Sequence, residues 1–307
     1  MSEPAIEVAG ARKRFGAVEA LRGVDLRVER GEVFGFLGPN GAGKTTAIRI
    51  LMGFVRRDAG EARVLGLDAW RDTVAVKARV GFLPDVIAFG GGFTGQAFLD
   101  YTASLRGMRG PSSRQTELLD RLQLSRSALQ RKVRGYSSGM AKKLALAQAM
   151  QHDPELLIMD EPTEALDPLI RQELFALIRE ARLRGAAVFM SSHVLPDVQE
   201  VCERVALIRA GRIVETGAVD ALRQGKTRTM TVEFRTPPPD GFSAPGVKVL
   251  SREGARWRLA VSGDVNDIVR ELARHDLADF AYERMDLDEL FLRYYESGEG
   301  EEDNGDA

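Results

Sequence analysis

Residues 38–45, with the sequence GPNGAGKT, constrain the fold of this chain more than any other segment. They fit the pattern G-x4-G-K-[ST] and lie between an apolar run at 32–37 and a helical run at 46–52. Glycines let successive backbone N–H groups turn toward phosphate oxygens, and the start of the following helix adds a positive dipole. We therefore expect a strand, a phosphate-binding loop and a helix in that order, with a nucleoside triphosphate as the ligand.

Two side chains of this loop are suited to the chemistry of phosphates. Lys44 can reach the β- and γ-phosphates, and the hydroxyl of Thr45 can bind Mg²⁺. The loop by itself does not distinguish a GTPase from a kinase or a molecular motor. The candidate nucleotide-binding residues here are Gly38, Pro39, Asn40, Gly41, Ala42, Gly43, Lys44, Thr45 and Thr46.

A second apolar run, at 156–159, ends in the two carboxylates Asp160 and Glu161. In a parallel sheet the carboxyl end of this strand lies on the same edge as the phosphate loop. Asp160 can then face Mg²⁺, and Glu161 can face the attacking water. The alternative is a strand that ends in two solvated acids, and the nearby phosphate loop favours the paired site.

Two further segments are candidates for the same chemistry. His193 follows the apolar run 186–190, so it is expected at the same sheet edge, where its imidazole can donate a hydrogen bond to the γ-phosphate; a lone histidine is more often structural. Residues 136–140, YSSGM, precede a helix expected at 141–151 and offer a serine N-cap. Many helices begin in this way, but such a start also suits a phosphate contributed by another subunit.

The length indicates one large domain and a smaller one, or two domains of similar size, and the order of apolar runs indicates an α/β fold. The chain has 307 residues, of which 44% are hydrophobic and 29% charged, so it can bury a sizeable core. From residue 6 to about 217, apolar runs alternate with amphipathic stretches, which predicts a largely parallel sheet covered by helices. Residues 93–150 are helical in pattern and predict an inserted lobe. The clearest strands are expected at 32–37, 156–159, 186–190 and 205–208.

Beyond residue 217 the pattern becomes that of a small α+β domain. Strands are expected at 229–234, 247–250 and 257–261, with a proline-rich turn at 236–241. Helices are expected at 265–274, with Val265, Ile268, Val269 and Leu272 on one face, and at 287–295, where Asp286 and Glu289 form a plausible start. The acidic segment 297–307 is expected to be disordered.

Charge and cysteine content exclude several classes of function. The 43 Lys and Arg residues against 45 Asp and Glu residues leave a net charge of −2, so we expect no nucleic-acid partner. A single cysteine, Cys202, and three histidines make a disulfide framework and a zinc cluster implausible and indicate an intracellular chain. No signal peptide and no stretch long enough for a membrane span is apparent, so the chain is not expected to cross a bilayer.

Taken in order, these motifs resemble an ATP-binding cassette, the nucleotide-binding subunit of ABC transporters, over residues 5–217. Residues 38–45 resemble the Walker A loop, and residues 156–161 resemble the Walker B strand with its general base. Residues 136–140 are similar to the LSGGQ signature. Residues 164–167 and 192–193 resemble the D-loop and the H-switch.

The resemblance implies a fold and a domain plan. The fold is an α/β P-loop NTPase (RecA-like) cassette at 5–225, with a helical lobe inserted at about 85–150. The domain at 226–296 looks like the small C-terminal domain of stand-alone cassettes from bacterial exporters of drugs, antibiotics, lipids or polysaccharides. Phe15 sits where the family places an aromatic ring to stack on adenine, although a core phenylalanine is the alternative.

The resemblance also implies an activity, cofactors and partners. ATP and Mg²⁺ would bind between two copies of the chain, with Lys44, Glu161 and His193 as catalytic residues. The partner copy would contribute Ser137, Ser138, Gly139 and Asp167 in a head-to-tail dimer. Hydrolysis would power export through a separate integral membrane permease, which would hold this cytoplasmic subunit at the inner face of the cell membrane.

Four positions, in three motifs, depart from the family pattern. Asp85 aligns with the glutamine of the Q-loop and is a candidate Mg²⁺ ligand beside Thr45 and Asp160, although its carboxylate is shorter. Ser138 and Met140 replace a glycine and a glutamine of the signature, and Glu164 occupies a D-loop position often held by a small polar residue. Two alternatives stay open: a cassette that works without a permease, and a nucleotide-gated subunit with weakened hydrolysis.

Overall fold

The computed structural model describes residues 3–87, 89, 92–108, 110, 112–223, 228–236, 244–261 and 264–284. The chain divides into two compact units, Met1–Ala218 and Val219–Ala307. This division falls slightly before the boundary expected at 225/226. Within the described residues, no helix is long and apolar enough to span a membrane.

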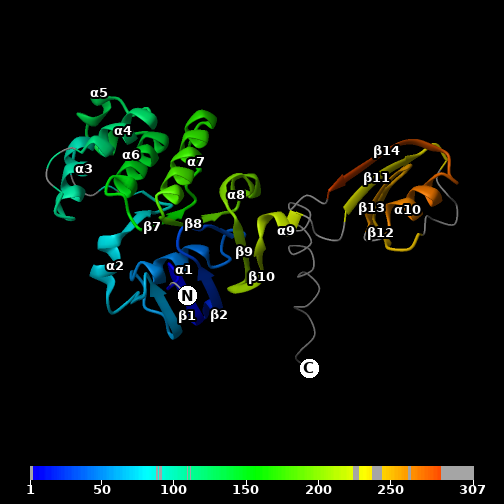
Figure 1. The fold of residues 1–307 in the computed structure, drawn as a ribbon, viewed down its shortest axis with the longest axis horizontal. Helices are drawn as coiled ribbons and strands as arrows, with labels where there is room; N and C mark the ends of the chain where they lie inside the picture. Colours follow the sequence, from blue (N-terminus) through cyan, green and yellow to red (C-terminus); the bar gives the residue numbers. More distant parts are fainter. Residues whose placement is uncertain are drawn as a thin grey trace. The chain divides into compact units, whose positions relative to one another are not determined.

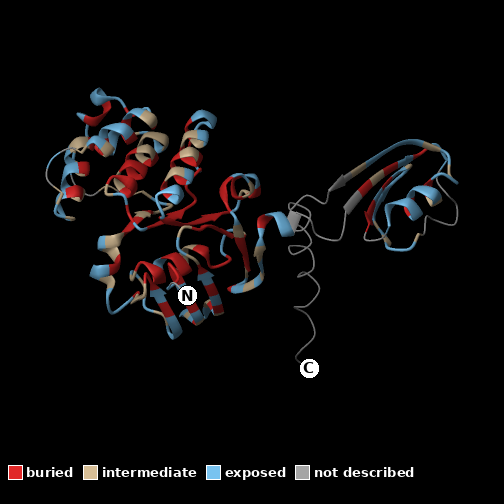
Figure 2. Cartoon of the chain, in the orientation of Figure 1, coloured by how far each residue is buried: buried red, intermediate tan, exposed pale blue. Residues whose placement is uncertain are grey.

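A six-stranded sheet forms the centre of the first unit, in the order β10-β9-β3-β8-β7-β6 (Figure 1). The strands pair in parallel except at the β9–β10 edge. Every residue of β3, β7 and β8 is buried, which explains their continuous apolar sequences (Figure 2). The four expected strands are confirmed, and β6 and β10 are additional. The strands are β3 (Val33–Leu37), β6 (Val80–Leu83), β7 (Leu156–Asp160), β8 (Ala187–Ser192), β9 (Arg204–Arg209) and β10 (Arg212–Ala218).

A second sheet is antiparallel. Two of its strands come before the phosphate loop in the sequence and two come after it. The sheet has the order β2-β1-β4-β5, with β1 at Ile6–Phe15, β2 at Val18–Val28, β4 at Ala59–Val64 and β5 at Leu67–Asp68. The expectation that the largely parallel sheet begins near residue 6 is therefore wrong. Buried and exposed residues alternate along much of β1 and β2, as in a sheet with one solvated face, and Phe15 pairs with Val18 across a tight turn.

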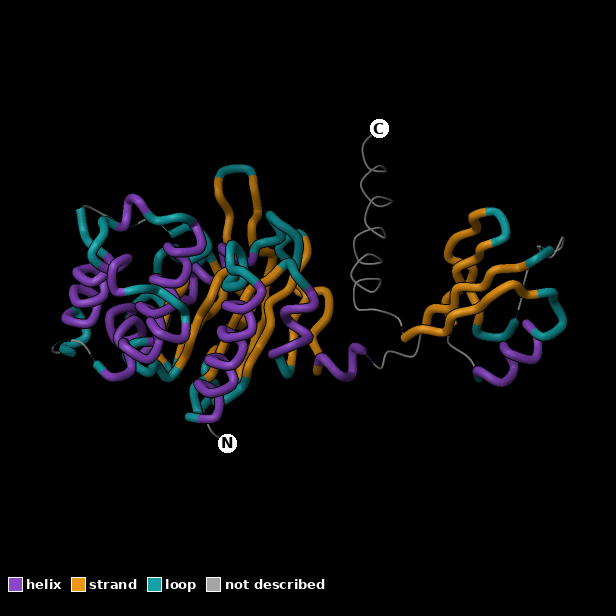
Figure 3. The backbone as a smooth tube through the Cα atoms, turned by 90° about the horizontal axis from the view of Figure 1, so that it is seen from above, coloured by secondary structure: helices purple, strands orange, loops and turns teal. Residues whose placement is uncertain are grey.

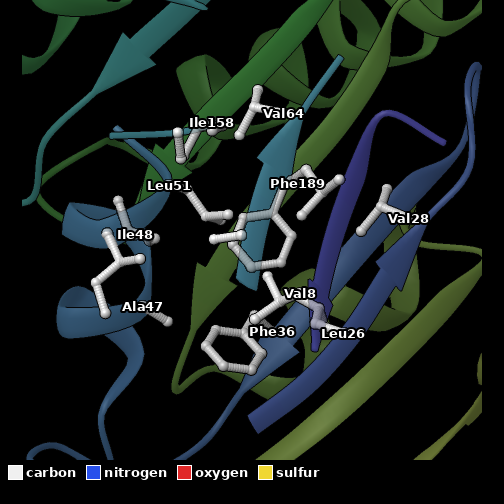
Figure 4. Packing of buried hydrophobic residues seen from close by; sticks show 14 of the residues in the cluster. Val8, Leu26, Val28, Phe36, Ala47, Ile48, Leu51, Val64, Ile158 and Phe189 are labelled. Atoms are coloured by element: carbon white, nitrogen blue, oxygen red, sulfur yellow. The ribbon is translucent and has the colours of Figure 1, made fainter. Parts of the chain in front are cut away.

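The main core lies between these two sheets and helix α1 (Lys44–Leu51). Figure 4 shows Phe36, Ile158 and Phe189 of the central sheet beside Ile48 and Leu51 of α1. The Phe189 ring lies 5.4 Å from that of Phe36, centroid to centroid, and all five side chains are nearly or completely inaccessible to solvent. This packing fixes the start of α1 against the end of β3, and so fixes the loop between them.

Residues 93–150 form the expected helical lobe (Figure 3). Four of its helices begin at a serine or threonine whose hydroxyl accepts a hydrogen bond from a backbone N–H, which explains where each helix starts. The lobe contains α3 (Gly95–Ser104), α4 (Ser113–Arg121), α5 (Arg126–Leu129), the short 3-10 helix η1 (Val133–Gly135) and α6 (Ser138–Met150). Outside the lobe lie α2 (Thr73–Arg79), α7 (Pro168–Leu183) and α8 (Leu195–Val201).

The second unit has an antiparallel sheet with the order β12-β13-β11-β14, packed against α10 (Val265–Leu272). The predicted strands and the helix are confirmed, whereas β14 is additional. The expected apolar face of α10 is only partly buried, because Ile268 and Leu272 join the core while Val265 and Val269 stay 36% and 45% exposed. The remaining elements are α9 (Val219–Arg223), β11 (Arg228–Phe234), β12 (Val247–Glu253), β13 (Arg256–Val261) and β14 (Leu277–Arg284).

Three expectations for this unit lie wholly or mostly outside the described residues. They are the turn at 236–241, the helix at 287–295 with its start at Asp286 and Glu289, and the acidic segment 297–307.

The central core provides a test of this packing. Replacing Phe189 by alanine removes a ring that stacks on Phe34 and packs at a tilt against Phe36, so Phe189→Ala should lower the free energy of unfolding by about 3–5 kcal/mol. Urea denaturation followed by circular dichroism measures this change. The control Leu183→Ala alters a side chain that is 79% exposed and should change the free energy by less than about 0.5 kcal/mol. Equal effects of the two substitutions would contradict the assigned core.

Candidate active site

The phosphate loop joins the buried strand β3 to helix α1, and two of its glycines are required by geometry. Gly43 has φ 114°, in a region that side-chain-bearing residues rarely adopt. A Cβ on Gly38 would lie 2.4 Å from the carbonyl oxygen of Ile208 on the neighbouring strand. The loop therefore follows a path along β9 that only glycine permits at these positions.

Lys44, the first residue of α1, is buried and points back into the loop. Its Nζ donates hydrogen bonds to the carbonyl oxygens of Gly38 at 2.6 Å and Pro39 at 3.2 Å. The same Nζ lies 3.2 Å from Oε1 of Glu161, an ion-pair contact without hydrogen-bond geometry. The predicted cation and the predicted general base thus lie in direct contact.

Asp160 ends strand β7 and is buried beside the loop. The hydroxyls of Ser191 and Thr45 donate hydrogen bonds to its carboxylate. Burial raises the pKa of Asp160, the two hydroxyls oppose that rise, and the negative charges of Asp85 and Glu161 add to it. A cation placed here would relieve the repulsion between these carboxylates.

These residues fit the binding of Mg²⁺. The Thr45 hydroxyl and the Asp160 carboxylate are hard oxygen donors that already contact each other. Among the described residues, no group of three or more His, Cys, Asp and Glu side chains is arranged to hold a metal ion. Mg²⁺ commonly uses one or two carboxylates together with substrate phosphates and water, so a sparse protein donor set suits it.

Glu161 is held in an unusual backbone conformation between two basic partners. Its φ of 48° is left-handed, and its backbone N–H donates to the Ser191 hydroxyl at 3.1 Å. Oε2 of Glu161 lies 2.9 Å from Nδ1 of His193 and also accepts the His193 backbone N–H at 3.3 Å. Because a carboxylate can only accept, Nδ1 carries the hydrogen in this pair, and strained conformations of this kind are often found at functional sites.

A pocket of about 320 Å³ opens over this group of residues. Nine of the predicted residues line it, whereas Phe15, Gly38, Ala42, Asp160, Asp167 and His193 do not. The lining residues are Val18, Glu19, Ala20, Arg22, Pro39, Asn40, Gly41, Gly43, Lys44, Thr45, Thr46, Asp85, Glu161, Ala210 and Gly211. The phosphate loop, the Walker B-like strand end and Asp85 therefore share one cavity.

Phe15 lies at the end of β1 and is 47% exposed, so the alternative of a core phenylalanine is wrong. The Nζ atom of Lys13 lies 5.3 Å from the centre of its ring. Val18, across the same tight turn, lines the pocket and is 66% exposed. Stacking of Phe15 on adenine stays a prediction.

Ser137 caps helix α6 by accepting the backbone N–H of Met140 at 3.3 Å, which confirms a serine-capped helix at this position. The helix begins at Ser138, three residues earlier than expected. Neither Ser137, Ser138 nor Gly139 lines the phosphate pocket of its own chain.

Asp167 caps α7 by accepting the Ile170 backbone N–H at 3.0 Å, and its carboxylate lies 3.6 Å from Nζ of Lys143. The hydrogen bond from Ile170 and the charge of Lys143 lower the pKa of Asp167. These contacts lie within one chain, so a role for Asp167 across a dimer interface stays a prediction.

Several residues of this site were not predicted from the sequence. Ser191 bridges Asp160 and Glu161, and the only hint of its role was its place at the end of an apolar run. Residues 18–20, 22 and 210–211 line the pocket although they lie far from the motifs in sequence. They reach it through the backbone hydrogen bonds of Arg22 to Gly211 and of Gly211 to Ala42, which no local pattern encodes.

Comparison with known proteins agrees with this geometry. The family described as ABC transporter matches residues 21–164. The daunorubicin resistance ATP-binding protein DrrA3 of Streptomyces coeruleorubidus is 36% identical over 95% of this chain and 96% of its own length. The Nod factor export ATP-binding protein I of Paraburkholderia xenovorans is 35% identical over 95% of this chain and 97% of its own.

Solved structures of the same fold also match. An ATP-binding subunit of an ABC transporter superposes with a TM-score of 0.66 at 25% identity, over 72% of this chain and 92% of that one. A dimeric post-hydrolysis cassette bound to ADP and Pi superposes with a TM-score of 0.64 at 21% identity, over 70% of this chain and 98% of that one. From its motifs, its site geometry and these relatives, the chain belongs to the ATP-binding subunits of the ABC transporter family and is an ATPase.

Proposed function

We propose that this protein hydrolyses Mg²⁺-ATP as one half of a head-to-tail dimer and so powers export through a separate membrane permease. The observation that supports this most is the contact series Lys44, Glu161 and His193 at the edge of the phosphate pocket. These contacts support the proposed roles of Lys44 as the phosphate-binding cation, Glu161 as the general base and His193 as the residue that orients this base.

Each of these residues has a separate role in hydrolysis. The phosphates of ATP take over the Lys44 ammonium, which releases Oε1 of Glu161 to accept a hydrogen from the attacking water. His193 keeps the carboxylate oriented through the hydrogen bond from its Nδ1–H to Oε2, and a second hydrogen, on Nε2, would be needed for the same ring to donate to the γ-phosphate. The backbone of residues 39–43 and the side chain of Thr46 bind the remaining phosphate oxygens.

Thr45 and Asp160 would hold Mg²⁺, with Asp85 as a further candidate ligand on the same pocket wall. The ion, when bound, neutralises charge that develops on the phosphates. Because burial already disfavours the charged form of Asp160, this carboxylate is suited to a cationic partner.

The second copy completes the site. Ser137, Ser138 and Gly139 form the exposed start of α6, where unpaired backbone amides and the helix dipole suit a phosphate. Since they do not line the pocket of their own chain, we assign them, with Asp167, to the ATP held by the partner copy. Chemistry that is complete only in the closed dimer is coupled to movement.

Export is proposed from the relatives that match nearly the whole chain, which are named for daunorubicin resistance and for Nod factor export. The permease would provide the path through the membrane and hold this subunit at its inner face. No nucleic-acid partner is proposed, because the net charge of −2 provides no excess of positive charge.

Glu161→Gln tests the proposed general base. The variant should bind ATP, lose about 10²-fold or more in turnover and accumulate closed dimers, because an amide cannot accept the water proton. Phosphate release, calorimetry and light scattering after gel filtration measure these three properties. The control Glu61→Gln changes an exposed carboxylate outside the pocket and should hydrolyse ATP normally. Wild-type turnover in Glu161→Gln would refute this role, and a wild-type chain without Mg²⁺-dependent ATPase activity would support the nucleotide-gated alternative.

Lys44→Ala tests the phosphate loop. Loss of a charged donor to the phosphates should weaken ATP binding by about tenfold or more, measured by isothermal titration calorimetry. Lys248→Ala, which changes an exposed lysine of the second unit, should leave the affinity unchanged. If both variants bound ATP equally well, the assignment of the loop would be wrong.

Purification from native membranes tests the partner. The chain solubilised in mild detergent should bring with it a membrane protein with several spans, and the transported compound should raise the ATPase rate of that complex. Full activity of the chain in the soluble fraction, with no membrane protein attached under any detergent condition, would favour the cassette that works without a permease.

A further inference from the structure

Two loops of the first unit and helix α6 meet at a second pocket, of about 360 Å³. Two of the positions that depart from the family pattern, Asp85 and Glu164, both line it. Lys142, on the second turn of α6, lies between them in the same lining. The remaining lining residues are Val86, Ile87, Ser138, Ala141 and Ala165.

Lys142 is a buried cation that shares its pocket with the carboxylates of Asp85 and Glu164. The residue is only 3% exposed, and lysine is almost never buried to this extent without compensating charge. No carboxylate among the described residues lies within ion-pairing distance of its ammonium, so Asp85, Glu164, Asp160 and Glu161 act on it through longer-range charge. Burial lowers the pKa of Lys142, and these four carboxylates oppose that change.

Asp85 connects this cation to the phosphate site. Its side chain lines both the phosphate pocket and the second pocket. Its negative charge acts on Asp160 on one side and on Lys142 on the other. A glutamine at this position would carry no charge, so this electrostatic link arises from the departure itself.

The start of α6 and Lys142 lie on the same side of this helix. Ser138 and Lys142 are four residues apart, and Ala141 lies between them, so all three face the pocket from one side of the helix. A Cβ on Gly139 would lie 2.9 Å from the carbonyl oxygen of Ala165, so the helix start packs closely against the D-loop. A shift of Lys142 would therefore move the segment that Ser137 caps.

We propose that Lys142 is a positioning residue whose charge holds the Asp85 loop and Glu164 against the first turns of α6. It thereby links the charge at the phosphate pocket to the orientation of the helix start at Ser137, Ser138 and Gly139. The effect on turnover rests on the proposed function, because this helix start is assigned to the partner's ATP. The neighbouring Lys143 has a different task, since it pairs with Asp167.

A double-mutant cycle on the full chain tests the link between Lys142 and Asp85. Lys142→Met removes the charge and keeps a stem of similar length, and it should lower kcat for Mg²⁺-ATP about tenfold with KM changed by less than about twofold. In the Asp85→Asn background, the same substitution should lower kcat by no more than about threefold, because the carboxylate that needs compensation is absent. Lys142→Arg restores the charge and should retain most of the activity.

Two controls separate this role from a general loss of structure. Lys132→Met changes an exposed lysine of the same lobe and should leave kcat unchanged. Removing the charge on one side of a buried set of opposite charges is destabilising, so Lys142→Met should lower the thermal midpoint and adding Asp85→Asn should restore part of it, which a general loss of structure would not allow. If Lys142→Met does not fold, Lys142→Gln takes its place in the cycle.

A second measurement does not depend on hydrolysis. Amide hydrogen exchange of the nucleotide-free protein should become faster at residues 85–87 and at the start of α6 in Lys142→Met, and less so in the double variant with Asp85→Asn. If the wild-type chain does not hydrolyse ATP, the proposed function fails while this measurement still decides the role of Lys142. Lys142→Met with wild-type kcat and wild-type hydrogen exchange would overturn the proposal. So would a double variant whose fold loss in kcat equals the product of the losses in Lys142→Met and Asp85→Asn alone.

Discussion

The alignment of three strands buried on both faces underlies the whole site. In β3, β8 and β7, parallel pairing places Leu37 opposite Ser192 and Asp160 opposite Ser191. The strands therefore end together, and the chain leaves the sheet at one edge in three places. The phosphate loop, the Asp160–Glu161 pair and His193 meet there because parallel strands bring their carboxyl ends to the same side.

Carboxylates dominate the charge at this edge. Two buried lysines, one after the phosphate loop and one in the helical lobe, carry compensating positive charge. Lys44 contacts Glu161 from the phosphate loop, whereas Lys142 interacts with Asp85 and Glu164 from the helical lobe. A buried ion pair is costly to form and costly to break on one side only. Asp85 lines both pockets. A ligand that changes the charge near either lysine therefore changes the electrostatic interactions in both pockets.

Local sequence patterns predicted the elements whose structure does not depend on pairing with distant residues. Continuous apolar runs gave the central strands, and serine or threonine caps marked the starts of helices such as α6. The N-terminal antiparallel sheet was missed, because alternation along β1 and β2 becomes informative only when β1 is seen to pair with both β2 and β4. In the second unit, β14 was missed because its strand pattern is completed by pairing with β11, and half of the expected α10 face is exposed.

The sequence by itself determined which chemistry this protein can perform. The spacing of glycines, lysine and threonine from 38 to 45 requires a backbone geometry that binds phosphates. A strand that ends in Asp160 and Glu161 requires a positively charged partner. Only the tertiary structure decided how these groups contact one another. The left-handed backbone of Glu161, its position between Lys44 and His193, and the gathering of Asp85, Lys142 and Glu164 around one pocket depend on residues far apart in the chain. Such contacts are set by strand register and by the packing of the helical lobe, which no local pattern of residues specifies.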